Sequence, residues 1–164
     1  MSKQQPHAIL YPGSFDPPTL GHLDLMRRAA GLFEKVYVGV LVNPSKKSLF
    51  SVEERVIMLK RITSHFPQIE VVAFSGLLID FCHELGVGQI LRGLRDSSDF
   101  EAEIKVAQGL RILDPVVETL FLGCEPRYSY LSSSMVREVA AGGGCIDAFL
   151  PEDIIEDVKK KYQV

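Results

Sequence analysis

The residues most suited to chemistry lie in the segment Tyr11-Pro-Gly-Ser-Phe-Asp-Pro-Pro-Thr-Leu-Gly-His22. It follows an apolar run at residues 8–11, so Gly13 falls where a buried strand would turn tightly and His22 in the first turn of the next helix. Free N–H groups and the positive end of the helix dipole favour a phosphate there. Gly21 leaves room for it, and His22 can donate to its oxygens. The alternative is a proline-rich turn with a capping histidine, but the full combination predicts a nucleotide site.

Two cationic loops follow later apolar runs. Asn43-Pro-Ser-Lys-Lys47 comes after residues 36–42, and Leu91-Arg-Gly-Leu-Arg-Asp96 comes after a short run at residues 89–91. A lysine can clamp a phosphate, and the fork of a guanidinium group matches phosphate oxygens. In a parallel sheet these two loops would lie at the carboxyl edge, beside the loop at residues 11–22, and there their cations favour phosphate binding. The alternatives are a solvated lysine surface and structural salt bridges from the arginines to Asp96, Asp99 or Glu103.

A run of hydroxyl groups, Tyr128-Ser-Tyr-Leu-Ser-Ser-Ser134, precedes a helix predicted over residues 133–141. Capping that helix requires only one hydroxyl group. The others indicate a second anion or nucleotide site at the start of this helix.

The elements that must position these loops alternate regularly along the chain. Continuous β-branched runs predict buried parallel strands, and capping signals such as Ser51-Val-Glu-Glu54 predict helix starts. The pattern predicts an α/β fold with a doubly wound five-stranded parallel sheet, in a single domain over residues 1–164 with a flexible terminus at residues 1–6. Strands are expected at residues 8–11, 36–42, 69–74, 89–91 and 116–122, and helices at 20–33, 51–65, 77–85, 96–112, 133–141 and 151–162.

Composition excludes several classes of protein. The 164 residues are 46% hydrophobic and 24% charged, which is typical of a globular chain, and the net charge of −3 argues against a nucleic-acid partner. Cys82, Cys124 and Cys145 are odd in number and widely spaced, so no closed disulfide framework is expected. No apolar run is long enough for a membrane span or a signal peptide. These features predict a cytoplasmic protein with no membrane partner.

Five motifs together resemble bacterial phosphopantetheine adenylyltransferases of the nucleotidyltransferase superfamily: Pro-Gly-Ser-Phe-Asp-Pro, Thr-x-Gly-His, Pro-Ser-Lys-Lys, Leu-Arg-Gly-Leu-Arg and Ser-Ser-Ser-x-Val-Arg-Glu. They occur in the order and spacing of that family, from about Ile9 to the carboxyl terminus. The resemblance implies a Rossmann-like fold and transfer of the adenylyl group of ATP to 4′-phosphopantetheine, giving dephospho-coenzyme A and pyrophosphate in coenzyme A biosynthesis. It also implies a requirement for Mg²⁺, a homohexamer and coenzyme A as a feedback ligand.

The resemblance further implies roles for individual residues. Those implied in catalysis are His22, which would stabilise the transition state, and Lys46, Arg92 and Arg95. Those implied in phosphopantetheine binding are Ser14, Lys46, Leu78 and Arg92. Those implied in ATP binding are Ser14, Phe15, His22, Gly93, Leu94, Arg95, Glu103, Tyr128, Ser129, Tyr130, Leu131, Ser132, Ser133 and Ser134. The chain departs from the family at Ala102, where tyrosine is common, and at Leu110, where asparagine is usual.

The sequence contains neither a catalytic triad nor a metal-ligand cluster, and adenylyl transfer needs neither. The attacking phosphate is already ionised, so the protein has to hold two anions in line and offset the charge that builds at the α-phosphorus. No metal site made of protein side chains is expected. The alternatives are an adenylyl- or cytidylyltransferase acting on another phosphate acceptor, and a catalytically silent nucleotide-binding regulatory module.

Overall fold

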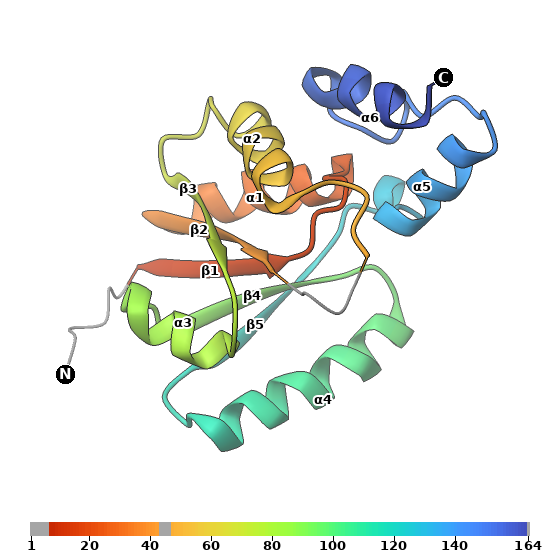
Figure 1. The fold of residues 1–164 in the computed structure, drawn as a ribbon. Helices are drawn as coiled ribbons and strands as arrows, with labels where there is room; N and C mark the ends of the chain where they lie inside the picture. The colour runs from red at the N-terminus through yellow and green to blue at the C-terminus, as the bar shows by residue number, and fades with distance from the viewer. Residues whose placement is uncertain (1–6, 43–46, 164) are drawn as a thin grey trace.

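The computed structural model describes residues 7–42 and 47–163, so the terminus at residues 1–6 and the site candidate Lys46 lie outside the described residues. Strands and helices alternate along the chain (Figure 1). The strands are β1 Ala8–Gly13, β2 Lys35–Leu41, β3 Ile69–Phe74, β4 Gln89–Leu94 and β5 Glu118–Gly123. The helices are α1 Leu20–Leu32, α2 Val52–Ile62, α3 Leu78–Leu85, α4 Ser97–Leu113, α5 Ser133–Ala141 and α6 Ile155–Tyr162, with 3₁₀ turns η1 Pro126–Tyr128 and η2 Glu152–Ile154.

The sheet is parallel throughout, with strand order β3-β2-β1-β4-β5. Alternation along β1 directs Ile9 and Tyr11 into the core under α1, α2, α5 and α6, whereas Ala8 and Leu10 face the core that α3 and α4 cover. Figure 1 shows these two groups of helices on opposite sides of the sheet. The chain therefore winds in both directions from β1, which confirms the predicted doubly wound five-stranded parallel sheet.

The helix starts follow from side-chain capping. Thr19 and Ser51 cap α1 and α2, each in a reciprocal arrangement with the third helical residue, which is His22 in α1 and Glu54 in α2. Such a cap satisfies two backbone N–H groups that the helix itself leaves without a partner. The predicted capping box at residues 51–54 is confirmed, and the cap at Thr19 sets the position of the candidate histidine.

The largest departure from the predicted boundaries is at β4. The strand continues to Leu94 because Arg92, Gly93 and Leu94 pair with the last three residues of β5. The apolar run ends at Leu91, so composition gave no sign of this continuation. Arg92 consequently lies within a strand and not, as predicted, in the loop after it.

The other departures are confined to the ends of elements. The second helix ends at Ile62 and not, as predicted, near residue 65. Just after Ile62, the Thr63 hydroxyl donates to the carbonyl of Leu59 at 2.7 Å. The last helix was expected over residues 151–162, but its first turn is the 3₁₀ turn η2 and regular helix begins at Ile155. End effects of this size are common because terminal turns of helices fray or tighten.

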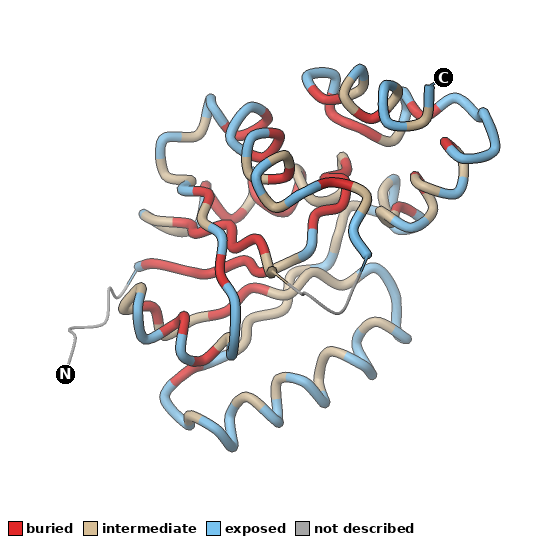
Figure 2. The backbone as a smooth tube through the Cα atoms, in the orientation of Figure 1, coloured by how far each residue is buried: buried red, intermediate tan, exposed pale blue. Residues whose placement is uncertain are grey.

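Burial is uneven across the sheet (Figure 2). Five of the six residues of β1 are buried, whereas neither the 17-residue helix α4 nor the edge strand β5 contains a buried residue. Ile112 near the end of α4 is 84% exposed. The core is therefore concentrated around β1 and β2. Among the described residues, no helix has the length and apolar character needed to cross a membrane.

Candidate active site

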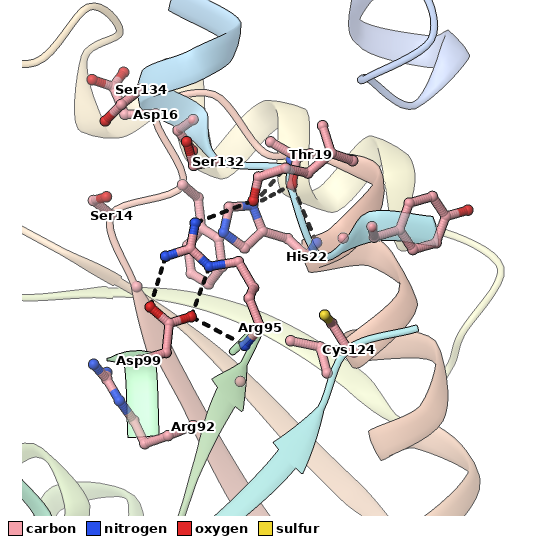
Figure 3. A pocket seen from close by; sticks show the side chains of 18 of the residues that line it. Ser14, Asp16, Thr19, His22, Arg92, Arg95, Asp99, Cys124, Ser132 and Ser134 are labelled. Atoms are coloured by element: carbon pink, nitrogen blue, oxygen red, sulfur yellow. Dashed lines mark hydrogen bonds and ion pairs between the residues drawn. The ribbon is translucent and has the colours of Figure 1, made fainter. Parts of the chain in front are cut away.

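A cavity of about 420 Å³ opens at the carboxyl ends of β1 and β4. Residues 13–22 form one side, here called the histidine wall, and residues 92–103 form the other, the arginine wall. The loop before α5 and the start of α5 close a third side, as Figure 3 shows for Ser132 and Ser134. Of the predicted site residues, the cavity brings together Ser14, Phe15, His22, Arg92, Gly93, Leu94, Arg95, Glu103, Tyr128, Leu131, Ser132, Ser133 and Ser134.

His22 is oriented by the cap of its own helix. The backbone N–H of Thr19 donates to Nδ1 of His22 at 3.0 Å, and the Thr19 hydroxyl accepts from the backbone N–H of His22 at 3.3 Å. Because Nδ1 accepts a hydrogen bond, the neutral ring carries its proton on Nε2. Burial, aided by the charge of Arg95, lowers the pKa of His22 to about 4. At pH 7 the ring is therefore a neutral donor through Nε2–H.

The buried ring of Phe15 supports the histidine wall. The backbone of Phe15 is left-handed, with φ of 48°, and its ring is only 1% exposed. The ring makes edge contacts with Tyr11 and His22, at centroid distances of 5.4 and 5.1 Å. A Cβ atom on Gly13 would lie 2.8 Å from the Phe15 ring, while the φ of Gly13 is not left-handed. Glycine at this position is thus explained by the close approach of Phe15, and the predicted tight turn is not its reason.

Two arginines from distant helices hold the same loop from behind. Arg55 of α2 is 3% exposed and donates to the carbonyl of Ser14 at 2.7 Å. Arg137 of α5 donates to the carbonyl of Asp16. The Asp16 carboxylate in turn accepts from two backbone N–H groups ahead of α2, at 2.8 and 2.9 Å. The conformation of the histidine wall is therefore determined by charged hydrogen bonds on several sides.

Arg92 and Arg95 are each held by a carboxylate from α4. Arg92 donates through Nε and Nη2 to Glu103 at 2.5 and 2.7 Å, and Arg95 donates through the same two atoms to Asp99 at 2.8 and 2.9 Å. Asp96 instead caps α4 by accepting from the N–H of Asp99. The salt bridges considered as an alternative are present, yet both arginines also line the cavity. Each guanidinium keeps further N–H groups for a ligand.

Gly93 joins the two walls. A Cβ atom at this position would lie 2.3 Å from Cδ1 of Leu25 on α1, closer than two such atoms approach. Glycine lets β4 approach α1, so that Arg92 and Arg95 reach the cavity that His22 also lines. The Gly in the Arg-Gly-Leu-Arg motif has a packing role in addition to any contact with a ligand.

The three serines at the start of α5 have different structural partners. Ser132 is the helix cap and accepts from the N–H of Met135 at 3.1 Å. The hydroxyl of Ser133 donates to the carbonyl of Pro17 at 2.8 Å, and Ser134 accepts from Arg137 at 3.2 Å. Capping thus accounts for one hydroxyl, as the sequence indicated. Ser133 connects α5 to the histidine wall, and Ser134 accepts from Arg137 of the same helix, which itself holds that wall.

Three of the predicted site residues that the structure describes are not among those that line the cavity. Leu78, at the start of α3, packs against the core that α3 and α4 cover, as does Leu110. Ser129 donates its hydroxyl to the carbonyl of Pro126. Tyr130 is 57% exposed. Lys46 falls outside the described residues, and the roles of all four stay predictions.

Sequence reasoning gave no role in the site to several residues that build it, although most of them stand in the quoted motifs and Asp99 was considered as a salt-bridge partner: Tyr11, Asp16, Thr19, Arg55, Asp99 and Arg137. Signals for two of them were present. Thr19 has the spacing of a cap ahead of His22, and Arg55 lies at helical spacing from the buried residues Met58 and Leu59. The hydrogen bonds of Asp16 and Arg137 are made to distant backbone groups, which no local pattern encodes.

The carboxylates around the cavity are committed to protein partners. Asp99 and Glu103 bind arginines, and Asp16 accepts from backbone N–H groups. Within residues 7–42 and 47–163, no group of three or more His, Cys, Asp or Glu side chains is placed to hold a metal ion.

Comparison with known proteins gives a consistent result. Residues 10–139 match the family described as cytidylyltransferase-like. A phosphopantetheine adenylyltransferase from Clostridium tetani is 52% identical over 93% of this chain and 95% of its own, and one from Clostridium botulinum (strain Langeland) is 55% identical over 93% of each chain. A crystal structure of a candidate nicotinate-nucleotide adenylyltransferase from Vibrio parahaemolyticus superposes with a TM-score of 0.67 at 14% identity, covering 96% of this chain and 99% of that one. At that identity, the superposition supports the fold alone.

Proposed function

Because the chain belongs to the cytidylyltransferase-like family, and within it to the phosphopantetheine adenylyltransferases, we propose that its cavity binds ATP and 4′-phosphopantetheine together between the two walls. The observation that carries this proposal is the meeting of His22, Arg92 and Arg95 in one cavity. Residues so distant in sequence converge at the carboxyl edge of the sheet, beside the position where strand order reverses. Open parallel sheets bind their ligands there.

The chain is a nucleotidyltransferase of coenzyme A biosynthesis that transfers the adenylyl group of ATP to 4′-phosphopantetheine. A phosphate oxygen of phosphopantetheine forms a bond to the α-phosphorus of ATP, and the bond from that phosphorus to the β-phosphate oxygen breaks. The products are dephospho-coenzyme A and pyrophosphate. Since the attacking phosphate is already ionised, the reaction requires no protein base to remove a proton.

The proposed roles follow from where the donors lie. His22, a neutral donor fixed by its helix cap, donates Nε2–H to an oxygen on the α-phosphorus, where charge grows in the transition state. Arg95, whose charge influences His22, binds the nucleotide phosphates, and Arg92 with Ser14 binds the phosphate of phosphopantetheine. The loop at Tyr128 and the serines at the start of α5 bind the rest of ATP.

Nucleotidyltransferases generally use a divalent metal ion, and we propose Mg²⁺ for this chain. The residues present fit a magnesium ion that the triphosphate of ATP carries, because the carboxylates nearby already have protein partners. Mg²⁺ prefers phosphate oxygens and retained waters to a cage of protein ligands. When bound, the ion would offset the charge of the outer phosphate groups.

A substrate panel tests the proposal. Pyrophosphate release is measured with ATP and Mg²⁺, using 4′-phosphopantetheine as the acceptor and nicotinamide mononucleotide as the control acceptor. A parallel reaction contains CTP and phosphocholine. Release with phosphopantetheine alone, together with dephospho-coenzyme A in the product mixture, is expected. Release only with another acceptor would support nucleotidyl transfer but contradict phosphopantetheine as the acceptor. Binding of ATP without release of pyrophosphate would favour a silent regulatory module.

The assignment of Arg92 to the acceptor has its own test. Replacing Arg92 with alanine should raise the KM for phosphopantetheine more than the KM for ATP, because the proposed contact is to the acceptor phosphate. Arg61→Ala is a matched control, since Arg61 is also paired with a carboxylate, Asp157, but lies outside the cavity. An equal rise in both KM values would remove Arg92 from the acceptor site.

We also propose that six chains assemble. The helix α4 and edge strand β5 have no buried residue within the described chain, and α4 with the turn after it exposes Phe100, Val106, Ile112, Leu113 and Val116. An apolar surface of this kind typically marks an interface between proteins. Resemblance to the family gives the number of chains, and the exposed apolar side chains indicate where contacts form.

Sedimentation velocity tests the assembly. Wild-type protein should sediment as a six-chain species, and Val106→Glu should yield smaller species because it puts a charge into the apolar surface. Leu32→Glu provides the control, since Leu32 is 70% exposed at the end of α1, away from α4. A wild-type protein of another size contradicts the hexamer. An intact hexamer in the Val106→Glu variant excludes that part of α4 from the interface.

Coenzyme A is proposed as a feedback ligand of the same cavity. It contains the whole skeleton of the product dephospho-coenzyme A and one further phosphate, so it should compete with both substrates. Inhibition that rising phosphopantetheine does not relieve would contradict a shared site. The cytoplasm is the proposed location, consistent with three free cysteines, one of which, Cys145, is exposed.

A further inference from the structure

Asp99 lines the cavity, yet its carboxylate is directed entirely at one residue. Oδ2 accepts from the backbone N–H of Arg95 at 3.1 Å and from its Nε at 2.8 Å, while Oδ1 accepts from Nη2 at 2.9 Å. Figure 3 shows the carboxylate facing the guanidinium group. Asp99 therefore fixes Arg95 at both its backbone and the end of its side chain.

The remaining hydrogen bonds of Arg95 determine which of its donors are free. A guanidinium group has five N–H donors. Asp99 takes the edge formed by Nε and Nη2, and one N–H of Nη1 donates to the carbonyl of Leu131 at 3.3 Å. One N–H on each of Nη1 and Nη2 is left. These two donors are available to the oxygens of a phosphate group.

Arg95 needs such support because of its place in the chain. It is the first residue after β4, and its side chain is 40% exposed. An unsupported arginine side chain loses much of its rotamer freedom when a ligand fixes it, which weakens binding. Hydrogen bonds from Arg95 hold the pKa of Asp99 below its usual value, so the carboxylate stays ionised at neutral pH.

Arg92 is supported in the same way as Arg95, by a carboxylate that lies one helical turn further along α4. Glu103, four residues after Asp99, takes Nε and Nη2 of Arg92, and Nη1 lies 3.5 Å from the carbonyl of Pro12. Both arginines thus have a carboxylate on one edge and a backbone carbonyl near Nη1. The first two turns of α4 support the donors of the arginine wall as a repeated unit.

We propose that Asp99 is a positioning residue: it holds Arg95 so that the free N–H groups of the guanidinium face the phosphates of ATP. This inference rests on the proposed function, since Arg95 acts on the nucleotide only if ATP binds in this cavity. A negative charge beside a triphosphate would by itself weaken binding, because like charges repel. The two views of Asp99 therefore predict opposite signs when its charge is removed.

The test measures ATP affinity and turnover in Asp99→Asn. Loss of orientation should reduce kcat/KM for ATP by about 10- to 100-fold, the scale for misplacing a catalytic group. Asp99→Glu, which retains the charge and can still pair with Arg95, should recover part of that loss. Glu84→Gln removes a charge of the same sign from an exposed position on α3, away from both walls, and should leave kcat/KM unchanged. Unchanged or tighter ATP binding in Asp99→Asn would overturn the proposal.

A double-mutant cycle with Arg95→Gln separates positioning from a general structural effect. If Asp99 acts through Arg95, then Asp99→Asn should have little further effect once Arg95 is replaced. An undiminished effect on that background would overturn the proposal while leaving the function intact. If wild-type protein releases no pyrophosphate in the substrate panel, the proposed function itself fails, and direct ATP titration of the same four proteins still decides whether the pair is coupled.

Discussion

The two walls of the cavity are built in opposite ways. The histidine wall follows the most buried strand, and its loop is fixed by the cap of α1, the packed ring of Phe15 and the charged groups of Arg55 and Asp16. The arginine wall ends in α4, which has no buried residue, and its cations are held by ion pairs at partly exposed positions.

This difference indicates a division of work within one site. Positions that are packed on all sides suit a group that must meet a transition state within a fraction of an ångström. Positions on a sparsely packed helix suit groups that recognise charged substrates, and the same helix leaves an apolar surface available to other chains. Substitutions in the histidine wall should therefore affect turnover, whereas those in the arginine wall should mainly affect binding and assembly.

The strongest test of this division is His22→Ala. Loss of the Nε2–H donor should lower kcat by about 10²–10³-fold while the KM values change little, because the contact strengthens in the transition state. His22→Gln, whose amide nitrogen can reach the region of Nε2, should recover part of the turnover. Steady-state kinetics on variants with an unchanged circular dichroism spectrum would measure this. Full activity in His22→Ala would end the distinction between the walls.

Gly93 tests the point where the walls meet. Gly93→Ala places a Cβ against Leu25 and should destabilise the fold by about 1–3 kcal/mol, the usual cost of overpacking. Gly123→Ala is the matched control, because a Cβ atom there meets nothing within 4 Å. Urea unfolding gives both values. Adding Leu25→Ala should relieve the strain, and a double variant with no such relief would assign the cost to another contact.

The pH dependence of stability tests how tightly the histidine wall encloses its ring. The pKa of His22 is about 4 in the folded chain and about 6.5 when unfolded. As pH falls from 6.5 to 4, the unfolded chain takes up the proton first. The free energy of unfolding therefore falls by about 1–3 kcal/mol, and this fall levels off below pH 4. Unfolding of wild type and His22→Asn, measured from pH 7 to 4, should show a smaller loss in the variant. Equal losses in the two proteins would mean that burial does not disfavour the protonated form of the His22 ring.

The smallest expected effect lies in α4. Gly109 is an exposed residue inside this helix, and a Cβ atom there would meet nothing within 4 Å. Gly109→Ala should therefore stabilise the chain by about 0.5–1 kcal/mol through helix propensity. Thermal unfolding measures the change. Destabilisation in the assembled protein would indicate that a neighbouring chain lies against Gly109, which would sharpen the view of α4 as an interface.

The succession of strands and helices along the chain and the positions of the loops were predictable from sequence because both depend on local patterns. Apolar runs marked all five strands, although the run at residues 89–91 covered only the first half of β4, and the cap at Ser51 marked a helix start. The extension of β4 was not predictable, because Arg92 is placed in a strand by its partner in β5.

Within the site, the residue types that bind anions were evident, whereas their supports were not. The choice of Asp99 over Asp96 as the partner of Arg95 depends on how α4 begins. The role of Arg55 depends on a carbonyl 41 positions earlier in the chain. Such contacts join elements that only the complete fold brings together, so neither composition nor spacing encodes them.

The carboxylates beside the arginines have a consequence for competition from small inorganic anions. Two bare guanidinium groups in an open cleft would attract any small anion, including free phosphate and sulfate. With Asp99 and Glu103 in place, each cation is already balanced, so a lone inorganic ion gains little attraction. A substrate that spans both arginines and the helix starts gains many hydrogen bonds at once. If the substrates bind as proposed, the cavity selects by the extent of the ligand more than by its charge, so inorganic phosphate and sulfate should compete weakly.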